Sequence, residues 1–270
     1  MWSYVVPLLA LVAGLGWNGP APAQERVDLE LVLAVDISLS MDTDEKQLQR
    51  DGYVAAFRHQ EVIDAITGGG YGRIAVTYVE WAGVASPQVV VPWMRIDGRE
   101  SAERFARFIE AAPLSRNFRT SISGAISYSA GLFEASGFAG LRRVIDISGD
   151  GPNNEGPMVT LARDAAVAAG ITINGLPIIL KRGDRLGFFD VAELDRYYEA
   201  CVIGGTGAFL VPVHSTDEFI PAIRRKLVLE IAGLEARVVP AQFTPERPAV
   251  DCLIGERLWQ EWMNRGEGVY

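Results

Sequence analysis

Five oxygen-bearing side chains stand in predicted loops where a hard metal ion would be bound. They supply two carboxylates and three hydroxyls, from Asp36, Ser38, Ser40, Thr120 and Asp150. Such ligands suit Mg²⁺, or else Mn²⁺ or Ca²⁺, and suit zinc poorly because zinc prefers nitrogen and sulfur. Two carboxylates would balance the charge of the ion, whereas neutral hydroxyls bind it weakly. We therefore expect the ion to keep waters and one open position, which a carboxylate from another molecule would fill.

Strand ends are predicted to deliver these side chains. The apolar run 31–35 (LVLAV) stops at Asp36, and continuous apolar character is typical of a parallel strand covered on both faces. Open parallel sheets bind ligands beyond the carboxyl ends of their strands. A later strand, 143–148, ends in the loop 149–154 that carries Asp150, and Thr120 precedes a helix. Asp146 competes with Asp150 as a ligand, but it falls inside the apolar strand.

The remaining segments alternate between strand and helix patterns, which predicts βαβ units and one α/β domain over 25–234. This domain is expected to be Rossmann-like and doubly wound, with a mostly parallel central sheet and helices on both faces. Pro92 places its strand at a sheet edge, and His59 lies on a predicted buried helix stripe as a packed residue. Strands are predicted at 27–35, 73–81, 88–96, 143–148, 171–180 and 208–213, and helices at 42–66, 101–111, 121–135, 158–169, 188–201 and 216–232.

Residues 27–234 resemble the von Willebrand factor type A (vWA) domain family. The resemblance rests on Asp36-x-Ser38-x-Ser40, a mid-domain threonine and the Asp150-Gly151 pair, which match the metal-ion-dependent adhesion site (MIDAS) of that family. It implies that Ser38, Ser40 and Thr120 are inner ligands of Mg²⁺ and that both aspartates are charge-bearing supports. A partner's Asp or Glu would complete the coordination sphere.

Two departures from the vWA pattern are visible. Leu39 stands between the serines where glycine is common, and Gly149 precedes Asp150 where the family commonly has threonine. The long loop after Asp150 and the cysteine-bearing tail resemble the uncharacterised secreted bacterial members of the family.

The chain ends add predictions about export. Residues 1–23 carry no charged side chain and end in Ala21-Pro22-Ala23, which predicts a signal peptide; an uncleaved membrane anchor is the alternative. No membrane span is expected in the mature chain, and the protein is predicted to be bacterial and exported, either periplasmic or secreted. Cys201 and Cys252 then predict one disulfide, with two buried thiols as the alternative. Residues 235–270 are predicted to be a C-terminal extension, and its part from Pro240 shows no clear period.

Three functional hypotheses follow from these residues. The net charge of −9 disfavours nucleic acid, which requires clustered Lys and Arg. The leading hypothesis is a non-enzymatic, metal-dependent protein-binding module. The alternative is a Mg²⁺-dependent, phosphatase-like hydrolase with Asp36 in its active site, but Ser38 occupies the position where such enzymes need a second carboxylate, and no local motif marks a histidine as base. The third is a structural domain whose aspartates and serines only cap helices and form turns.

Overall fold

The structure is a computed structural model that describes residues 24–180, 191, 193–233 and 249–265. The predicted signal peptide, 1–23, lies outside these residues, as do 188–190 and 192 of the helix predicted at 188–201. Residue 234 of the predicted domain and residues 235–248 and 266–270 of the predicted extension also lie outside them. Within the described ranges, no helix has the length and apolar character needed to cross a membrane.

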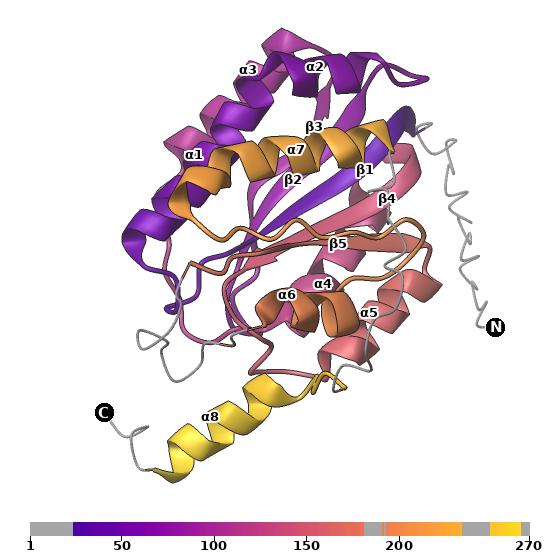
Figure 1. The fold of residues 1–270 in the computed structure, drawn as a ribbon. Helices are drawn as coiled ribbons and strands as arrows, with labels where there is room; N and C mark the ends of the chain where they lie inside the picture. The colour runs from indigo at the N-terminus through magenta and orange to yellow at the C-terminus, as the bar shows by residue number, and fades with distance from the viewer. Residues whose placement is uncertain (1–23, 181–190, 192, 234–248, 266–270) are drawn as a thin grey trace, which may run out of the picture.

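A five-stranded sheet forms the centre of the domain (Figure 1). Its strands lie in the order β3-β2-β1-β4-β5, and only β3 runs antiparallel to its neighbour. Pro92 therefore lies on an edge strand, as predicted. Such a strand has no neighbour on its open side, so an N–H that is missing on that side removes no hydrogen bond between strands. The strands are β1 (Glu25–Asp36), β2 (Ile74–Trp81), β3 (Gln88–Ile96), β4 (Phe138–Gly149) and β5 (Ile171–Pro177).

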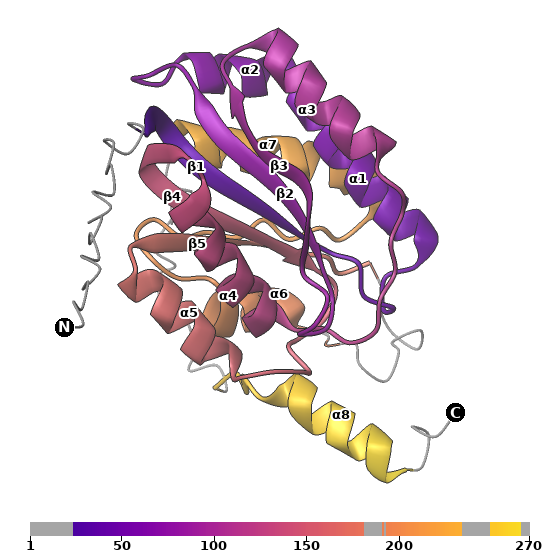
Figure 2. The same ribbon diagram turned by 180° about the vertical axis from the view of Figure 1, so that it is seen from behind.

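Helices cover both faces of the sheet, which confirms the predicted doubly wound α/β architecture (Figures 1 and 2). One face carries α1 (Thr43–Arg58), α2 (Gln60–Thr67), α3 (Arg99–Ala111) and α7 (Phe219–Ala232). The other carries α4 (Ile122–Leu132), α5 (Val159–Ala168) and α6 (Leu194–Tyr197), which continues as a π turn at Tyr198–Val202. Short 3₁₀ turns at Phe133–Ala135 and Thr216–Glu218 adjoin α4 and α7.

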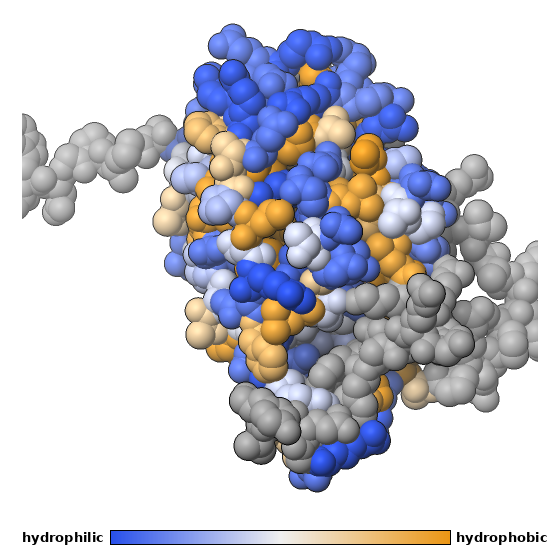
Figure 3. Space-filling view, turned by 90° about the vertical axis from the view of Figure 1, so that its left-hand side faces the viewer, coloured by the Kyte–Doolittle hydropathy of each residue, from blue (hydrophilic) through white to orange (hydrophobic). Residues whose placement is uncertain are grey.

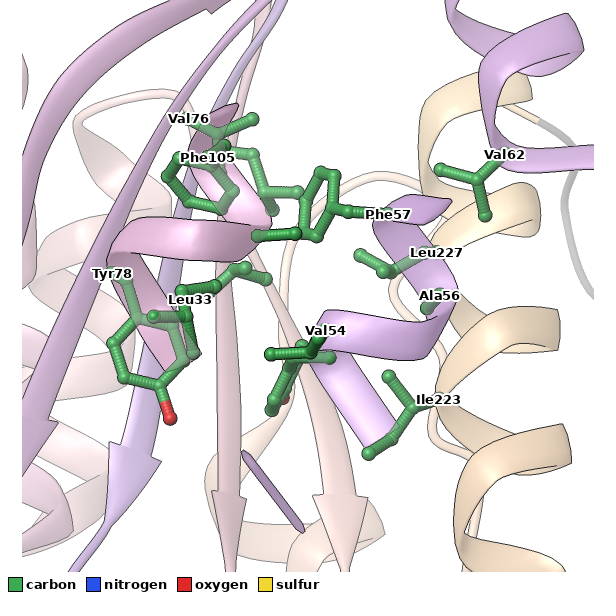
Figure 4. Packing of buried hydrophobic residues seen from close by; sticks show 14 of the residues in the cluster. Leu33, Val54, Ala56, Phe57, Val62, Val76, Tyr78, Phe105, Ile223 and Leu227 are labelled. Carbon is green, nitrogen blue, oxygen red and sulfur yellow. The ribbon is translucent and has the colours of Figure 1, made fainter. Parts of the chain in front are cut away.

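Alternate residues of β1 enter two separate cores, because successive side chains of a strand point to opposite faces. Leu31 and Leu33 pack with α1, α3 and α7, whereas Val32 and Ala34 pack with α4 and the π turn. Figure 4 shows the first core, in which Phe57 of α1 meets Phe105 of α3 edge to face at 4.8 Å. Burial on both faces explains why the sequence of β1 is almost continuously apolar.

The single helix predicted at 42–66 is wrong, because the chain breaks at His59. His59 has extended backbone (φ −81°, ψ 139°), and its Nδ1 accepts a hydrogen bond from the N–H of Glu61, so it ends α1 and caps α2. Its ring is about one-third exposed and contacts the guanidinium of Arg224 at 3.0 Å. His59 is therefore a cap between two helices rather than a packed member of one buried stripe.

The predicted strand 208–213 and the featureless tail are also corrected. Leu210 and Val213 make only isolated bridges, to Gly175 and Ile178, so 208–213 does not form a regular strand. Residues Ile254–Asn264 form a helix, α8, which the mixed Trp-rich pattern concealed. The predicted disulfide between Cys201 and Cys252 is confirmed, with 5.6 Å between the Cα atoms, and it fastens the segment before α8 to the π turn.

The surface seen in Figure 3 is a mosaic. Hydrophilic residues gather at the end that carries α2 and α3, and hydrophobic residues lie in small groups below them. This agrees with the acidic composition and with apolar side chains that are mostly withdrawn into the two cores.

A buried charge cluster holds α7 against the sheet. The ammonium of Lys226 on α7 contacts the carboxylates of Asp146 on β4 and Glu230 on α7, and all three side chains are almost inaccessible to water. Asn174 on β5 donates to Glu230 at 3.1 Å. Burial, followed by the charge of Asp146, raises the pKa of Glu230 to about 7, and burial also raises the pKa of Asp146. Lys226 is thus the cation on which two buried carboxylates depend.

We predict that Lys226→Met lowers the free energy of unfolding by about 3–5 kcal/mol at pH 8, because it leaves two buried carboxylates without their cation. The deficit relative to wild type should shrink towards pH 5, because protonation of Glu230, whose pKa is raised to about 7, removes one of the two buried negative charges. Urea denaturation at both pH values measures this. The control is Arg225→Met on the exposed side of the same helix, and equal losses in the two variants would refute the role of Lys226.

Candidate metal-binding site

The first two carboxylates of the site come from neighbouring strand ends. Asp36 is the last residue of β1, and Asp150 follows the last residue of β4. The two strands are parallel and adjacent, with Val35 paired to Ser148. Sheet topology alone therefore brings both aspartates to the carboxyl edge of the sheet, where ligands bind in folds of this kind.

A chain of hydrogen bonds joins four of the five predicted residues. The N–H of Ser38 donates to Oδ1 of Asp36 at 2.6 Å, and the hydroxyl oxygens of Ser38 and Ser40 lie 2.8 Å apart. The Ser40 hydroxyl donates to Oδ1 of Asp150 at 2.6 Å. Alternate spacing places both serines on the same side of the loop, so that they bridge the two carboxylates.

Thr120 reaches the same place from a third loop. Its N–H donates to the side-chain oxygen of Asn154 at 2.9 Å, and its carbonyl accepts the N–H of Asn154 at 2.8 Å. The N–H of Asn117 donates to the carbonyl of Ile37, which joins the loop of Thr120 to the loop of the serines. Ser38, Ser40 and Thr120 line one cavity of about 200 Å³.

The donor set suits a divalent ion with oxygen ligands. Asp36 is fully buried, and its Oδ2 has no hydrogen-bond partner among the described residues. Burial, followed by the negative charge of Asp150, raises the pKa of Asp36 to about 8. A bound cation would offset both effects, because it supplies positive charge beside the two carboxylates. Among the described residues, no group of three or more His, Cys, Asp or Glu forms an alternative metal site.

Lys46 is a neighbour of the site that the sequence did not reveal. It lies in the first turns of α1 with only 6% of its surface exposed, and its Nζ makes no hydrogen bond within the described part of the chain. Burial, followed by the charge of Arg116, lowers the pKa of Lys46, whereas Asp36 and Asp150 act in the opposite direction. Its ammonium group therefore partly offsets the charge of the two aspartates. A lysine near a helix start gave no sequence signal of burial.

Two asparagines that follow Asp150 support the site and were also missed. Asn154 fixes Thr120, as described above. Asn153 is fully buried; its side-chain oxygen accepts the N–H of Ser123 at 3.0 Å, and its N–H donates to the hydroxyl of Tyr197 at 3.1 Å. The signal available was the run 149–154 (GDGPNN), in which two amides directly follow the turn at the end of a strand.

The family model described as "Protein of unknown function (DUF1194)" matches residues 26–235. The chain belongs to the DUF1194 family. Among curated proteins, none matches it. The match ends before α8, so this helix and the half-cystine Cys252 lie beyond the part of DUF1194 that the model describes.

Solved structures show that this DUF1194 chain has the vWA fold. Proximal thread matrix protein 1 from the mussel byssus is 19% identical with a TM-score of 0.55, and the alignment covers 78% of this chain and 49% of that protein. A second structure of it, with a zinc-occupied MIDAS motif, is 15% identical with a TM-score of 0.52 and the same coverage.

Two bacterial structures share this fold. The pilus adhesin SpaC from Lactobacillus rhamnosus GG is 12% identical with a TM-score of 0.55, with coverage of 77% and 31%. The von Willebrand factor type A structure from Catenulispora acidiphila is 15% identical with a TM-score of 0.50, with coverage of 76% and 43%. The chain thus matches less than half of each of these proteins.

We predict that Asp36→Asn stabilises the metal-free protein. The pKa of Asp36 is raised to about 8 in the fold, so the folded state favours the protonated carboxyl group. The stability that this group contributes is therefore fully present below its unfolded pKa and is lost as the pH rises through 8. In chelator at pH 8, the variant should exceed wild type by roughly 2–4 kcal/mol, and the difference should vanish near pH 4. Chemical denaturation measures it. A variant that is less stable than wild type at pH 8 would contradict this account.

Proposed function

We propose that this protein is a non-enzymatic, metal-dependent binding module that captures a carboxylate of a protein partner through a MIDAS-type Mg²⁺ site. The observation that carries the proposal is the convergence of three hydroxyl-bearing residues on one cavity, two of which are hydrogen-bonded to the carboxylates of Asp36 and Asp150. One oxygen of the buried Asp36 carboxylate also lacks a hydrogen-bond partner among the described residues. Oxygen ligands of this kind favour Mg²⁺, with Mn²⁺ or Ca²⁺ as the nearest substitutes.

Each residue has a distinct part in this proposal. Ser38, Ser40 and Thr120 would hold the ion through neutral oxygens, and Asp36 and Asp150 would supply negative charge beside it. The ion, when bound, supplies an electrophilic position for an acidic side chain. Because the five residues carry only two negative charges, a third carboxylate from a partner adds favourable attraction. The zinc-occupied MIDAS motif of the mussel protein, which shares the fold, supports a divalent ion at this position.

The surroundings of Ser38 favour binding over hydrolysis. The Ser38 hydroxyl contacts the Ser40 hydroxyl, and the site offers it no histidine: His59 contacts Glu61 and Arg224, and the N–H of His214 donates to Glu218. A hydrolase needs a group that transfers protons at the reacting bond. The hydroxyls and carboxylates of this site instead supply the oxygen ligands that a divalent ion needs, and that ion would bind the carboxylate of a partner.

We further propose that the module acts outside the cytosol, exported by residues 1–23. The Cys201–Cys252 disulfide supports this, because such bonds persist in oxidising compartments such as the periplasm. The pilus adhesin among the structures that share the fold is a surface protein by its name. The expected partner is therefore another envelope or extracellular protein with an exposed Asp or Glu.

We predict that millimolar Mg²⁺ stabilises the protein through this site. At a free ion concentration of about 100 times Kd, the free energy of unfolding should rise by about 2.7 kcal/mol, because the ion binds only the folded chain. Thermal denaturation and calorimetry with Mg²⁺ alone measure the effect. It should disappear in Asp36→Ala and fall in Thr120→Ala, whereas the surface variant Asp164→Ala should behave like wild type. Equal binding by Asp36→Ala would reject the site.

We also predict that partner capture depends on the ion. Protein bound from an envelope extract in Mg²⁺ should be released by chelator, and Asp36→Ala should capture none of it. Capture that survives chelation would argue against a metal-bridged carboxylate. Metal-dependent turnover of a generic phosphate or ester substrate, lost in Asp36→Asn, would instead favour the hydrolase hypothesis.

A further inference from the structure

Helix α8 closes one side of the proposed metal site. Trp259 of α8 lines the same cavity as Ser38, Ser40 and Thr120. The helix begins at Ile254, after the Cys201–Cys252 disulfide, and Cys252 and Ile254 pack against the core beneath α4 and α5. In Figures 1 and 2 it lies across the end of the molecule where the site loops gather.

A direct contact fixes the start of α8 to the loop after Asp150. The side-chain amide of Asn153 donates to Oε1 of Glu256 at 2.8 Å. Gly255 is buried against the carbonyl of Asn153, and a β-carbon at this position would collide with that backbone. The disulfide, this hydrogen bond and the glycine contact together hold Trp259 at a defined position beside the metal ligands.

Arg119 and Phe118 complete the wall that Trp259 begins. The guanidinium of Arg119 lies over the Trp259 ring, 3.3 Å from its centre, and the Phe118 ring meets Trp259 edge to face at 5.9 Å. Arg119 has φ of 72°, the only positive φ found at a non-glycine residue within the described part of the chain. Such backbone costs free energy and occurs preferentially at ligand sites. Glu155, 3.7 Å away, partly balances the charge of Arg119.

The wall of this cavity carries two kinds of side chain. Hydroxyl-bearing residues, Ser38, Ser40 and Thr120, share it with apolar residues and one cation, which are Leu39, Phe118, Pro152, Trp259 and Arg119. Its volume of about 200 Å³ is below the range of cofactor and drug sites and suits one or two amino-acid side chains. A partner segment with an acidic residue beside an apolar residue matches both kinds of side chain, because its carboxylate can meet the hydroxyls and the cation while its apolar group meets the aromatic side chains.

We propose that Trp259, Phe118 and Arg119 form a specificity pocket that selects a partner segment in which the metal-bound Asp or Glu stands next to a large aliphatic side chain. The inference rests on the proposed function, since the metal-bound carboxylate places the neighbouring residue. Trp259 would bury that side chain, and Arg119 would add attraction for the acidic segment. The C-terminal helix thereby determines which carboxylates the site accepts.

The test compares two blocked peptides, Gly-Leu-Asp-Leu-Gly and Gly-Ser-Asp-Ser-Gly, that bind the full chain in millimolar Mg²⁺. The leucine peptide should bind about tenfold more tightly, as burial of one aliphatic side chain predicts. Trp259→Ala should abolish the preference and leave the Mg²⁺ affinity within about twofold of wild type. Phe118→Ala, at an exposed residue, should reduce the preference, while the disulfide and the Asn153–Glu256 hydrogen bond still hold α8 in place. Met263→Ala, an exposed residue on the same helix, is the matched control and should keep it.

Calorimetry with Mg²⁺ alone separates the two proposals. Absent metal binding would refute the proposed function and the pocket together. Metal binding with equal affinity for the two peptides would overturn only the specificity pocket, whereas metal binding with no affinity for either peptide would count against carboxylate capture as well. An equal loss of both peptides in Trp259→Ala would also overturn the specificity pocket, because Trp259 would then support the site without reading the neighbouring residue.

Discussion

The structure depends on one electrostatic constraint, the placement of two carboxylates at adjacent strand ends. The parallel pairing of β1 with β4 forces Asp36 and Asp150 together, and burial withdraws Asp36 from water. Like charges in a buried site repel strongly and cost free energy unless a cation or proton compensates them. The serine bridge and the three joined loops make this arrangement rigid, so the compensation must come from elsewhere.

Strand β4 carries two contrasting solutions to this constraint. Asp146 lies within the strand, where Lys226 supplies its positive charge, and it serves to attach α7 to the sheet. Asp150 lies just beyond the strand end, and its negative charge acts on the buried Asp36, whose Oδ2 has no hydrogen-bond partner among the described residues. The buried ammonium of Lys46 offsets part of this negative charge from a distance. In the first cluster, the ammonium of Lys226 contacts the carboxylates of Asp146 and Glu230 directly, so the fold itself supplies the compensating charge. The second leaves attraction for an external cation, which is the property expected of a binding site.

Sequence reasoning recovered the features that local chemistry determines. The apolar run of β1, the Asp-x-Ser-x-Ser spacing and the acidic turn at Asp150 each follow from strand burial or loop chemistry, so the five candidate residues could be named without tertiary information. The errors arose where long-range contacts decide. His59 breaks a helix because its ring caps the following one, residues 208–213 meet β5 only at single bridges, and α8 is held by a disulfide and by Asn153. The spacing of apolar residues along the sequence gives no information about any of these contacts.

The position of α8 assigns different roles to the vWA fold and to the C-terminal segment. The vWA fold places the five candidate oxygen ligands, and the DUF1194 match that includes them ends at residue 235. Trp259 enters the same cavity from beyond that boundary, on a helix that a covalent bond secures. In the proposed function, the two parts of the chain therefore have separate tasks. The fold holds the ion that binds any carboxylate, and the helix beyond the family match supplies the apolar surface that distinguishes one neighbouring residue from another, because burial of an aliphatic side chain is favourable only where such a surface exists.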